Sequence, residues 1–275
     1  MAFDISQTRG CICYDNKMMP ATISSISADG SSTGTAGFPV SNLAYDDTTM
    51  IYKTGTSASN RTIDITFTSG VQVNCLGFAG HTLITGGYTL TLRAWNGADF
   101  NTIIATQAMT GTSDPNFFCR FPTTTATTWR IELGLPSGTR PAFQIGLLFF
   151  GRFLEFEKNP TDGGVFYSQT IDAEPLPALG GTLYWRPGPV RVTEHAELSF
   201  PRVPASMMLF LQGTIMAQNA GKVLGLIWPE QVSFFQPNGT QHLFGKLESL
   251  VPGPRMSGGA PPHVYDLTLT MKGLS

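Results

Sequence analysis

The sequence is poor in charge. Only 13% of its 275 residues are charged and the formal net charge is −2, whereas an average globular protein has roughly a quarter of its residues charged. Lysine and arginine form no cluster, so a nucleic-acid backbone has no basic stripe to bind, and nothing favours attraction to an anionic membrane. We therefore expect neither a nucleic-acid partner nor insertion into a membrane.

Long apolar runs are also missing. The longest, at 145–150, is far shorter than the roughly 20 residues that a membrane-spanning helix needs. The first ten residues do not show a basic region followed by an apolar stretch, so we expect no signal peptide and a protein that is made and kept soluble.

Cysteine is scarce. The chain has four, which are Cys11, Cys13, Cys75 and Cys119. Their spacing fits neither a disulfide framework nor the paired cysteines of a zinc finger. We expect reduced and mostly buried thiols.

Catalytic motifs are absent at any convincing spacing. The chain has no phosphate-binding glycine loop and no His-Glu-x-x-His. His195 and Glu197 begin a deaminase-like pattern, but no Pro-Cys-x-x-Cys follows, and His242 and His263 stand alone. Two acidic pairs leave a glycan hydrolase open as an alternative, namely Asp46–Asp47 and Glu155/Glu157. We expect no enzyme, no catalytic residue and no cofactor.

The sequence does contain the alternation of apolar and polar residues that is typical of β-strands. In 61–67 isoleucine and phenylalanine alternate with threonine and aspartate, which sends one face to a core and the other to water. Ser69-Gly70 predicts a turn into a second strand at 71–79, and Asn96-Gly97 predicts a hairpin after a strand at 88–95. Strands at intervals of about 8–12 residues indicate an all-β sandwich.

The first half also resembles a discoidin-type (coagulation factor 5/8 C-type) β-sandwich. The matching residues are Asn42-Leu43, Asp46-Asp47-Thr48, Tyr52, 62–67, 77–83, 128–133 and 141–151. Tyr52 replaces the tryptophan usual in the family, and the glycine of the acidic turn is absent. The resemblance implies a sandwich at 21–153, preceded by an N-terminal arm at 1–20.

The second half differs in character. A polar stretch at 154–164, with one proline and a glycine pair, predicts a linker. Beyond it, 165–275 reads as a smaller β-rich domain with one helix at about 205–219, which follows Pro204 and ends before Gly221. The predicted fold class is therefore all-β in the main: a discoidin-like sandwich followed by this domain.

The resemblance also implies where a ligand would bind, because loops at one end of discoidin-type sandwiches bind sugars or lipid headgroups, sometimes beside calcium. Asp46 and Asp47 could offer oxygen ligands to calcium, or could satisfy backbone amides in an Asx-turn. The candidates for contact with a glycan are Tyr45, Tyr52, Trp95 and His81. The three aromatic residues could equally belong to the core, and His81 could be structural.

The second half resembles baseplate or distal-tail proteins of long-tailed bacteriophages. The matching segments are 196–200 (AELSF), 224–229 (LGLIWP), 244–247 (FGKL) and 265–269 (YDLTL). This resemblance implies a structural protein of the virion tail, made in the host cytoplasm. It would form a ring of six or three copies between the tail tube and the tip or hub proteins, with the sandwich displayed outward. The alternatives are a carbohydrate-binding module that recognises the host surface, and the glycan hydrolase.

Overall fold

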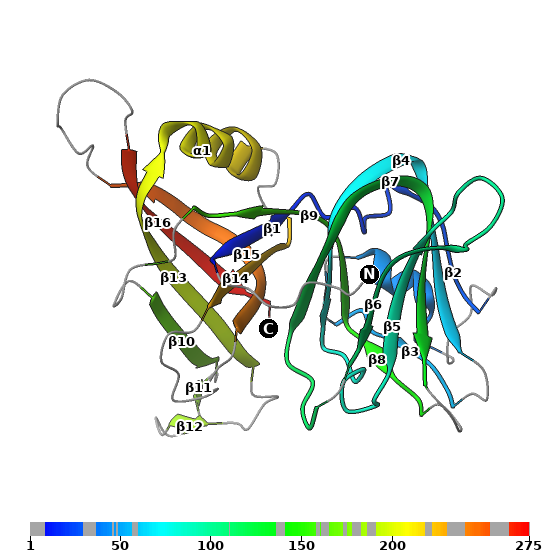
Figure 1. Cartoon of the computed structure of the whole chain (residues 1–275). Helices are drawn as coiled ribbons and strands as arrows, with labels where there is room; N and C mark the ends of the chain where they lie inside the picture. Colours follow the sequence, from blue (N-terminus) through cyan, green and yellow to red (C-terminus); the bar gives the residue numbers. More distant parts are fainter. Residues whose placement is uncertain are drawn as a thin grey trace. The chain divides into compact units, whose positions relative to one another are not determined.

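The computed structural model describes residues 9–29, 37–45, 47, 49–56, 60–109, 111–135, 141–157, 160, 165–172, 175–177, 183–185, 191–217, 222–229, 240–253 and 264–274. These residues form mainly antiparallel β-sheet with one short 3-10 helix and one longer helical segment, which confirms the mainly all-β fold class predicted from the sequence (Figure 1). The described helical residues include no segment with the length and apolarity to cross a bilayer.

The chain divides into two compact units. The first comprises Met1–Phe156 and Lys222–His242, and the second comprises Glu157–Gly221 and Leu243–Ser275. The domain limits expected from the sequence, with a linker at 154–164, stay a prediction. The units differ from them in one respect, because a segment from late in the chain returns to the first unit.

The first unit holds most of the strands. They are β1 (Cys11–Tyr14), β2 (Ile23–Ala28), β3 (Tyr52–Lys53), β4 (Arg61–Ala79), β5 (Thr89–Ala94), β6 (Thr102–Ala108), β7 (Phe117–Gly134), β8 (Gln144–Ile145), β9 (Leu147–Glu155) and β14 (Leu224–Pro229), with a short 3-10 helix η1 (Val40–Ala44). The main path of pairing within this unit runs β14-β1-β9-β4-β7-β5-β6; β2 pairs with β4, and β3 with β8. The predicted N-terminal arm thus contains a buried strand, β1, between β9 and β14.

The long strands β4 and β7 belong to both layers of the sandwich. Their pairing changes register between Thr66 and Val71, and beyond this point β4 also pairs with β9. In Figure 1 the two strands arch together over one end of the unit. The turn predicted at Ser69-Gly70 is therefore wrong, because the chain bends there and continues as a single strand. A bulge of this kind redirects a strand without ending it.

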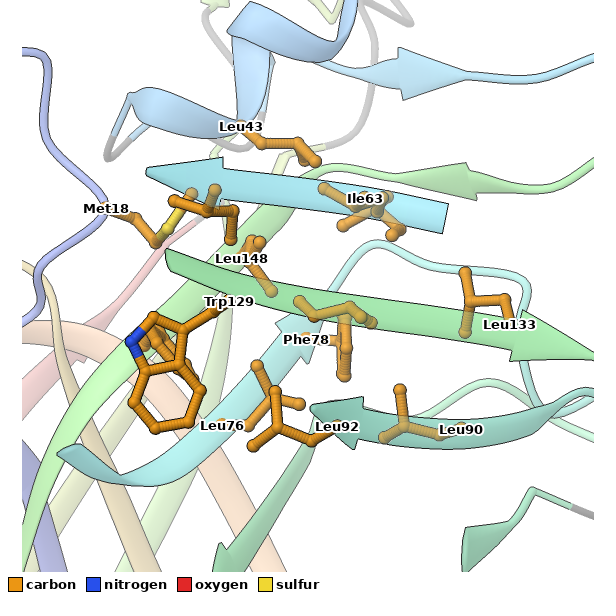
Figure 2. Close-up of a cluster of buried hydrophobic side chains, with 14 of the residues drawn as sticks. Met18, Leu43, Ile63, Leu76, Phe78, Leu90, Leu92, Trp129, Leu133 and Leu148 are labelled. Carbon is orange, nitrogen blue, oxygen red and sulfur yellow. The ribbon is translucent and has the colours of Figure 1, made fainter. Parts of the chain in front are cut away.

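The core of the sandwich follows the period of two seen in the sequence. Ile63, Ile65 and Phe67 of β4 are buried, and the residues between them are not. Figure 2 shows Trp129 of β7 among the buried side chains. The Trp129 ring packs edge-on against Phe150 of β9, with the ring centroids 5.0 Å apart. Burial of such large side chains contributes about 1.5–3 kcal/mol each, so the sheet that carries the outward residues is firmly held.

The second unit is a smaller antiparallel sheet with the helical segment. Its elements are β10 (Val165–Asp172), β11 (Pro175–Pro177), β12 (Leu183–Trp185), β13 (Arg191–Pro204), α1 (Ala205–Phe210), a π-helical continuation η2 (Leu211–Met216), β15 (Thr240–Pro252) and β16 (Val264–Gly273). Strand order within this unit is β10-β13-β16-β15, and β11 pairs with β12.

The helical segment buries one face. Met208, Leu211 and Ile215 are buried, whereas Leu209 and Met216 are exposed. At α-helical spacing Met216 would share the face of Met208, Leu211 and Ile215, yet it is 39% exposed. A π-helical turn has more residues than an α-helical turn, so it rotates the residues that follow it.

Candidate functional site

The outward side of β4, β5 and β7 carries charged side chains in register. Asp64 of β4 lies opposite Arg130 of β7, which in turn lies opposite Arg93 of β5. Glu132 of β7 lies two residues along the same side. We call these four side chains, together with the loop 95–101 between β5 and β6, the Trp95 face.

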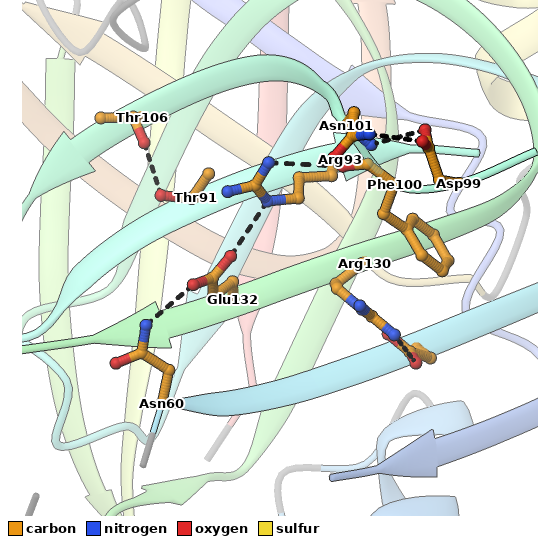
Figure 3. Close-up of polar contacts among 10 residues, drawn as sticks. Asn60, Thr91, Arg93, Asp99, Phe100, Asn101, Thr106, Arg130 and Glu132 are labelled. Atoms are coloured by element: carbon orange, nitrogen blue, oxygen red, sulfur yellow. Dashed lines mark hydrogen bonds and ion pairs between the residues drawn. The ribbon is translucent and has the colours of Figure 1, made fainter. Parts of the chain in front are cut away.

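Each arginine of the Trp95 face is bound to a carboxylate (Figure 3). Arg130 donates from Nε to Asp64 Oδ1 and from Nη2 to Asp64 Oδ2, both at 2.7 Å. This two-point pairing raises the pKa of the Arg130 guanidinium. Arg93 donates from Nε to Glu132 Oε2 at 2.9 Å, and the other Glu132 oxygen accepts from Asn60 at 2.8 Å. Bidentate pairs fix the planes of both groups, so the face is ordered before any ligand arrives.

The ordered arginine holds an aromatic pair. Figure 3 shows the guanidinium of Arg130 beside the ring of Phe100, with Cζ 4.2 Å from the ring centroid. Phe100 in turn packs edge-to-face against Trp95, with the centroids 5.0 Å apart and the planes inclined by 67°. The backbone N–H of Trp95 donates to Thr128 O of β7 at 2.9 Å. Trp95 nevertheless keeps 41% of its surface exposed, so a fixed aromatic ring faces solvent here.

The loop beside Trp95 is closed by its own side chains. Asn96 Oδ1 accepts from the backbone N–H groups of Ala98 and Asp99 at 2.8 and 2.9 Å. Asp99 accepts from the side-chain amides of both Asn96 and Asn101. Gly97 has a φ of 102°, a left-handed conformation that favours glycine. The Asn96-Gly97 signal thus marks the reversal, in a longer loop than the two-residue hairpin that the dipeptide favours.

Such a face can bind but offers little for catalysis. An exposed aromatic ring can pack against the apolar C–H face of a sugar, and the fixed polar groups around it can exchange hydrogen bonds with hydroxyls. Asp64 and Glu132 each accept hydrogen bonds from an arginine, so both carboxylates are already engaged in structural ion pairs.

The structure separates the sequence-predicted aromatic candidates. Trp95 is part of the face. Tyr45 follows η1 and is 45% exposed, so it remains open to solvent in a different loop. Tyr52 is 2% exposed in β3 and packs edge-on against Phe143. Burial raises the pKa of Tyr52. Tyr52 is therefore a core residue and not a candidate for contact with a glycan.

His81 is buried in the loop after β4. Its Nδ1 accepts from the backbone N–H of Leu83 at 3.2 Å and lies 3.7 Å from Asp114 Oδ1. Asp114 also accepts from the backbone N–H groups of Ile84 and Thr85. Burial lowers the pKa of His81, and Asp114 opposes that effect without cancelling it. These contacts give His81 a structural place in the loop.

The acidic turn shows no cation site in the part that is described. Asp46 lies outside the described residues. Asp47 Oδ1 accepts from the backbone N–H and the hydroxyl of Thr49, at 2.8 and 2.7 Å, which is the geometry of an Asx-turn. Among the described residues, no three histidine, cysteine or acidic side chains are grouped so as to hold a metal ion.

Several residues of the Trp95 face were not identified as candidates from the sequence. They are Asp64, Arg93, Asp99, Phe100, Arg130 and Glu132. Their signal is the polar half of the same alternation that predicted the strands, since residues between buried positions must point outward. What the sequence does not say is which strands are neighbours, and the ion pairs depend on that.

Comparison with known proteins gives a limited result. No family model matches the chain, and no curated protein sequence does. Among solved structures, the CBM32-1 and CBM32-2 domains of Clostridium perfringens ZmpB match 49% of this chain at 16% identity and a TM-score of 0.40. The match spans 35% of that chain, about a third of its length.

Two other solved structures match along nearly all of their own length. Chitosan-binding module 1 from a chitosanase/glucanase of Paenibacillus sp. IK-5 has 18% identity, a TM-score of 0.38 and coverage of 50% of this chain and 98% of that one. A fucose-binding module of Streptococcus pneumoniae has 7% identity, a TM-score of 0.39 and coverage of 50% and 95%. At these scores the likeness carries no argument about what this chain binds.

Proposed function

We propose that this chain is a non-catalytic carbohydrate-binding protein and that it binds glycans on the Trp95 face. The observation that carries the proposal is the exposed ring of Trp95, which Phe100 and Arg130 hold in one orientation. A ring that is already ordered loses little conformational entropy on binding, so more of the contact energy appears as affinity. Recognition of glycans on a host surface is the biological role that this proposal implies.

The test is binding of purified protein to a glycan array, followed by calorimetric titration with the glycans that bind. Truncation of a central tryptophan in an interface commonly costs about 2 kcal/mol or more, so Trp95→Ala should weaken binding by about 30-fold. Tyr45→Ala is the matched control, because it removes an equally exposed aromatic ring from a different loop. Loss of binding in Tyr45→Ala but not in Trp95→Ala would show that the glycan binds at the loop of Tyr45, and would contradict the proposal that it binds on the Trp95 face.

The ion pairs of Glu155 give little support to the alternative that the chain is a glycan hydrolase. Glu155 is bound by Arg120 at 2.6 Å and lies 3.5 Å from Arg9, so it is engaged in ion pairs. Incubation of the protein with the glycans that it binds should release no reducing sugar. Release of reducing ends at a rate that depends on one of the two acidic pairs would replace this proposal with an enzymatic one.

A second candidate function concerns the second unit. Leu209, Met216 and Val251 there are 70%, 39% and 54% exposed. These three residues are candidates for contact with another protein. The resemblance of this unit to distal-tail proteins is the ground for the second proposal, a ring adaptor of a phage tail with six or three copies between the tail tube and the tip or hub proteins.

The two functions are compatible, because a tail protein can display a glycan-binding sandwich. Negative-stain microscopy and light scattering of the purified chain test the adaptor directly. Rings that disassemble on Leu209→Glu would support it, and a strictly monomeric protein at high concentration would count against it.

A further inference from the structure

The charges of the Trp95 face do not cancel. Arg93 and Arg130 are each bound to one carboxylate, Glu132 and Asp64 respectively. A third carboxylate, Asp99, is held by neutral donors, because it accepts from the side-chain amides of Asn96 and Asn101 and from the Asn101 backbone N–H. Two positive charges against three negative charges leave this face with one net negative charge.

The charge of each arginine is already matched by a carboxylate of the face. Arg130 uses Nε and Nη2 in its bidentate pair and presents its plane to Phe100. Arg93 donates to Glu132 and also, from Nη1, to the Phe100 carbonyl at 3.3 Å. An acidic sugar that displaced the carboxylate from either guanidinium would leave that carboxylate without its partner, which is costly where the pair is partly buried.

From these charges we propose that the glycan bound on the Trp95 face carries no carboxylate, and that acidic sugars are rejected. The inference rests on the proposed function and names its ligand class: oligosaccharides of neutral hexoses, pentoses or amino sugars, without acidic groups. Trp95 supplies the apolar contact to the ring C–H groups. The amides of the 95–101 loop and the carboxylates exchange hydrogen bonds with sugar hydroxyls.

The expected discrimination follows from Coulomb's law. A carboxylate of the ligand about 5–8 Å from Asp99, at a dielectric constant between those of a protein surface and of water, is repelled enough to weaken binding about threefold to tenfold. The Debye length is about 30 Å at 0.01 M salt and a few ångströms at 1 M, so the effect should be large at low salt and small at high salt. Binding of a neutral glycan should not depend on salt.

The experiment is calorimetric titration of the intact chain at pH 7 in low and in high sodium chloride. Three series of oligosaccharides of equal length are compared: neutral ones (cello-, xylo- and N-acetylchito-oligosaccharides), acidic oligogalacturonates, and fully deacetylated chitosan oligomers. Trp95→Ala is measured in each series to show that binding occurs on this face. Asp99→Asn removes the unpaired charge, and exposed Glu157→Gln makes the same change of net charge elsewhere.

We expect a neutral series to bind without salt dependence. At low salt the acidic series should bind at least threefold more weakly than the neutral series. Asp99→Asn should reduce the difference in affinity between the neutral and the acidic series, and Glu157→Gln should leave that difference unchanged. Equal or tighter Trp95-dependent binding of oligogalacturonates at low salt overturns the inference but not the proposed function. Trp95-dependent binding of deacetylated chitosan that is tighter at low salt than at high salt supports the inference, because a net negative face attracts a cationic sugar. Chitosan binding that is weaker at low salt would overturn it, because the face would then not be net negative. Absence of Trp95-dependent binding in all three series refutes the proposed function itself, and the ligand class with it.

Discussion

Replacement of Gly225 by alanine tests whether the late segment 222–229 completes the first unit. Gly225 lies in β14, opposite Cys13 of β1, and is buried. A Cβ added there would meet Phe118 Cζ at 2.1 Å, with two further ring atoms within 2.8 Å. Phe118 is fully buried and packs edge-on against Phe149 at 5.5 Å between centroids. The ring therefore cannot move without disturbing its own neighbours.

Overpacking of this kind costs about 1–3 kcal/mol. Each kcal/mol lowers the Tm of a unit of this size by about 2–4 °C, so Gly225→Ala should lower the Tm by about 2–12 °C. The assay is thermal and urea unfolding, followed by circular dichroism. Gly55→Ala is the control, because a Cβ at Gly55 meets nothing within 4 Å and its φ is not left-handed. It should change stability by less than about 0.5 kcal/mol.

A double-mutant cycle ties the loss to the contact between β14 and Phe118. Phe118→Leu removes the part of the ring that the new methyl group would strike, so it should cost less in the Gly225→Ala background than in the wild type. The coupling energy should be at least about 0.5 kcal/mol. If Gly225→Ala unfolds like the wild type and the coupling is zero, β14 does not pack on Phe118, and the reasoning that assigns 222–229 to the sandwich fails.

Two further predictions concern a titrating group and an ion pair. Because burial lowers the pKa of His81, the unfolded chain takes up this proton first as the pH falls below about 6.5, so the free energy of unfolding should decrease from pH 7 to pH 5. In His81→Gln that decrease should be smaller, as pH-dependent urea unfolding would show; equal slopes in the two proteins would contradict the assignment. Arg130→Lys should cost about 0.5–1 kcal/mol, since lysine cannot form the two-point pair with Asp64 and the pair is partly exposed. It should also loosen Trp95, measured as faster depolarisation of its fluorescence in a variant that lacks the other tryptophans; unchanged depolarisation would show that Arg130 does not hold the ring.

The strands of the sandwich could be predicted because their signal is local. The alternation in 61–67 placed Ile63 and Ile65 inside and Asp64 outside, as the structure has them. The period of two is a property of any half-buried strand. Ser69-Gly70 misled because small residues accommodate a bend as readily as a turn, and only the pairing of β4 with both β7 and β9 shows which occurs.

The candidate site could be predicted only in part. Trp95 was identified as a candidate, but its supports Phe100 and Arg130 come from a loop and from a strand distant in sequence. The exposure of Tyr45 and the burial of Tyr52 were likewise undecidable, since two tyrosines in one polar segment have the same local signal. Which of them enters the core depends on the pairing of β3 with β8, and that is a long-range event.

The central claim, that Trp95 contacts the glycan, is tested most directly by the indole N–H signals in a ¹⁵N–¹H spectrum during titration with a neutral oligosaccharide. Trp129 serves as an internal reference, because its ring is fully buried and its Nε1 donates to Ala126 O at 3.1 Å. We expect a saturable shift of the Trp95 indole signal at the affinity found by calorimetry, with the Trp129 signal unmoved. Saturable glycan binding that leaves the Trp95 signal in place would contradict it.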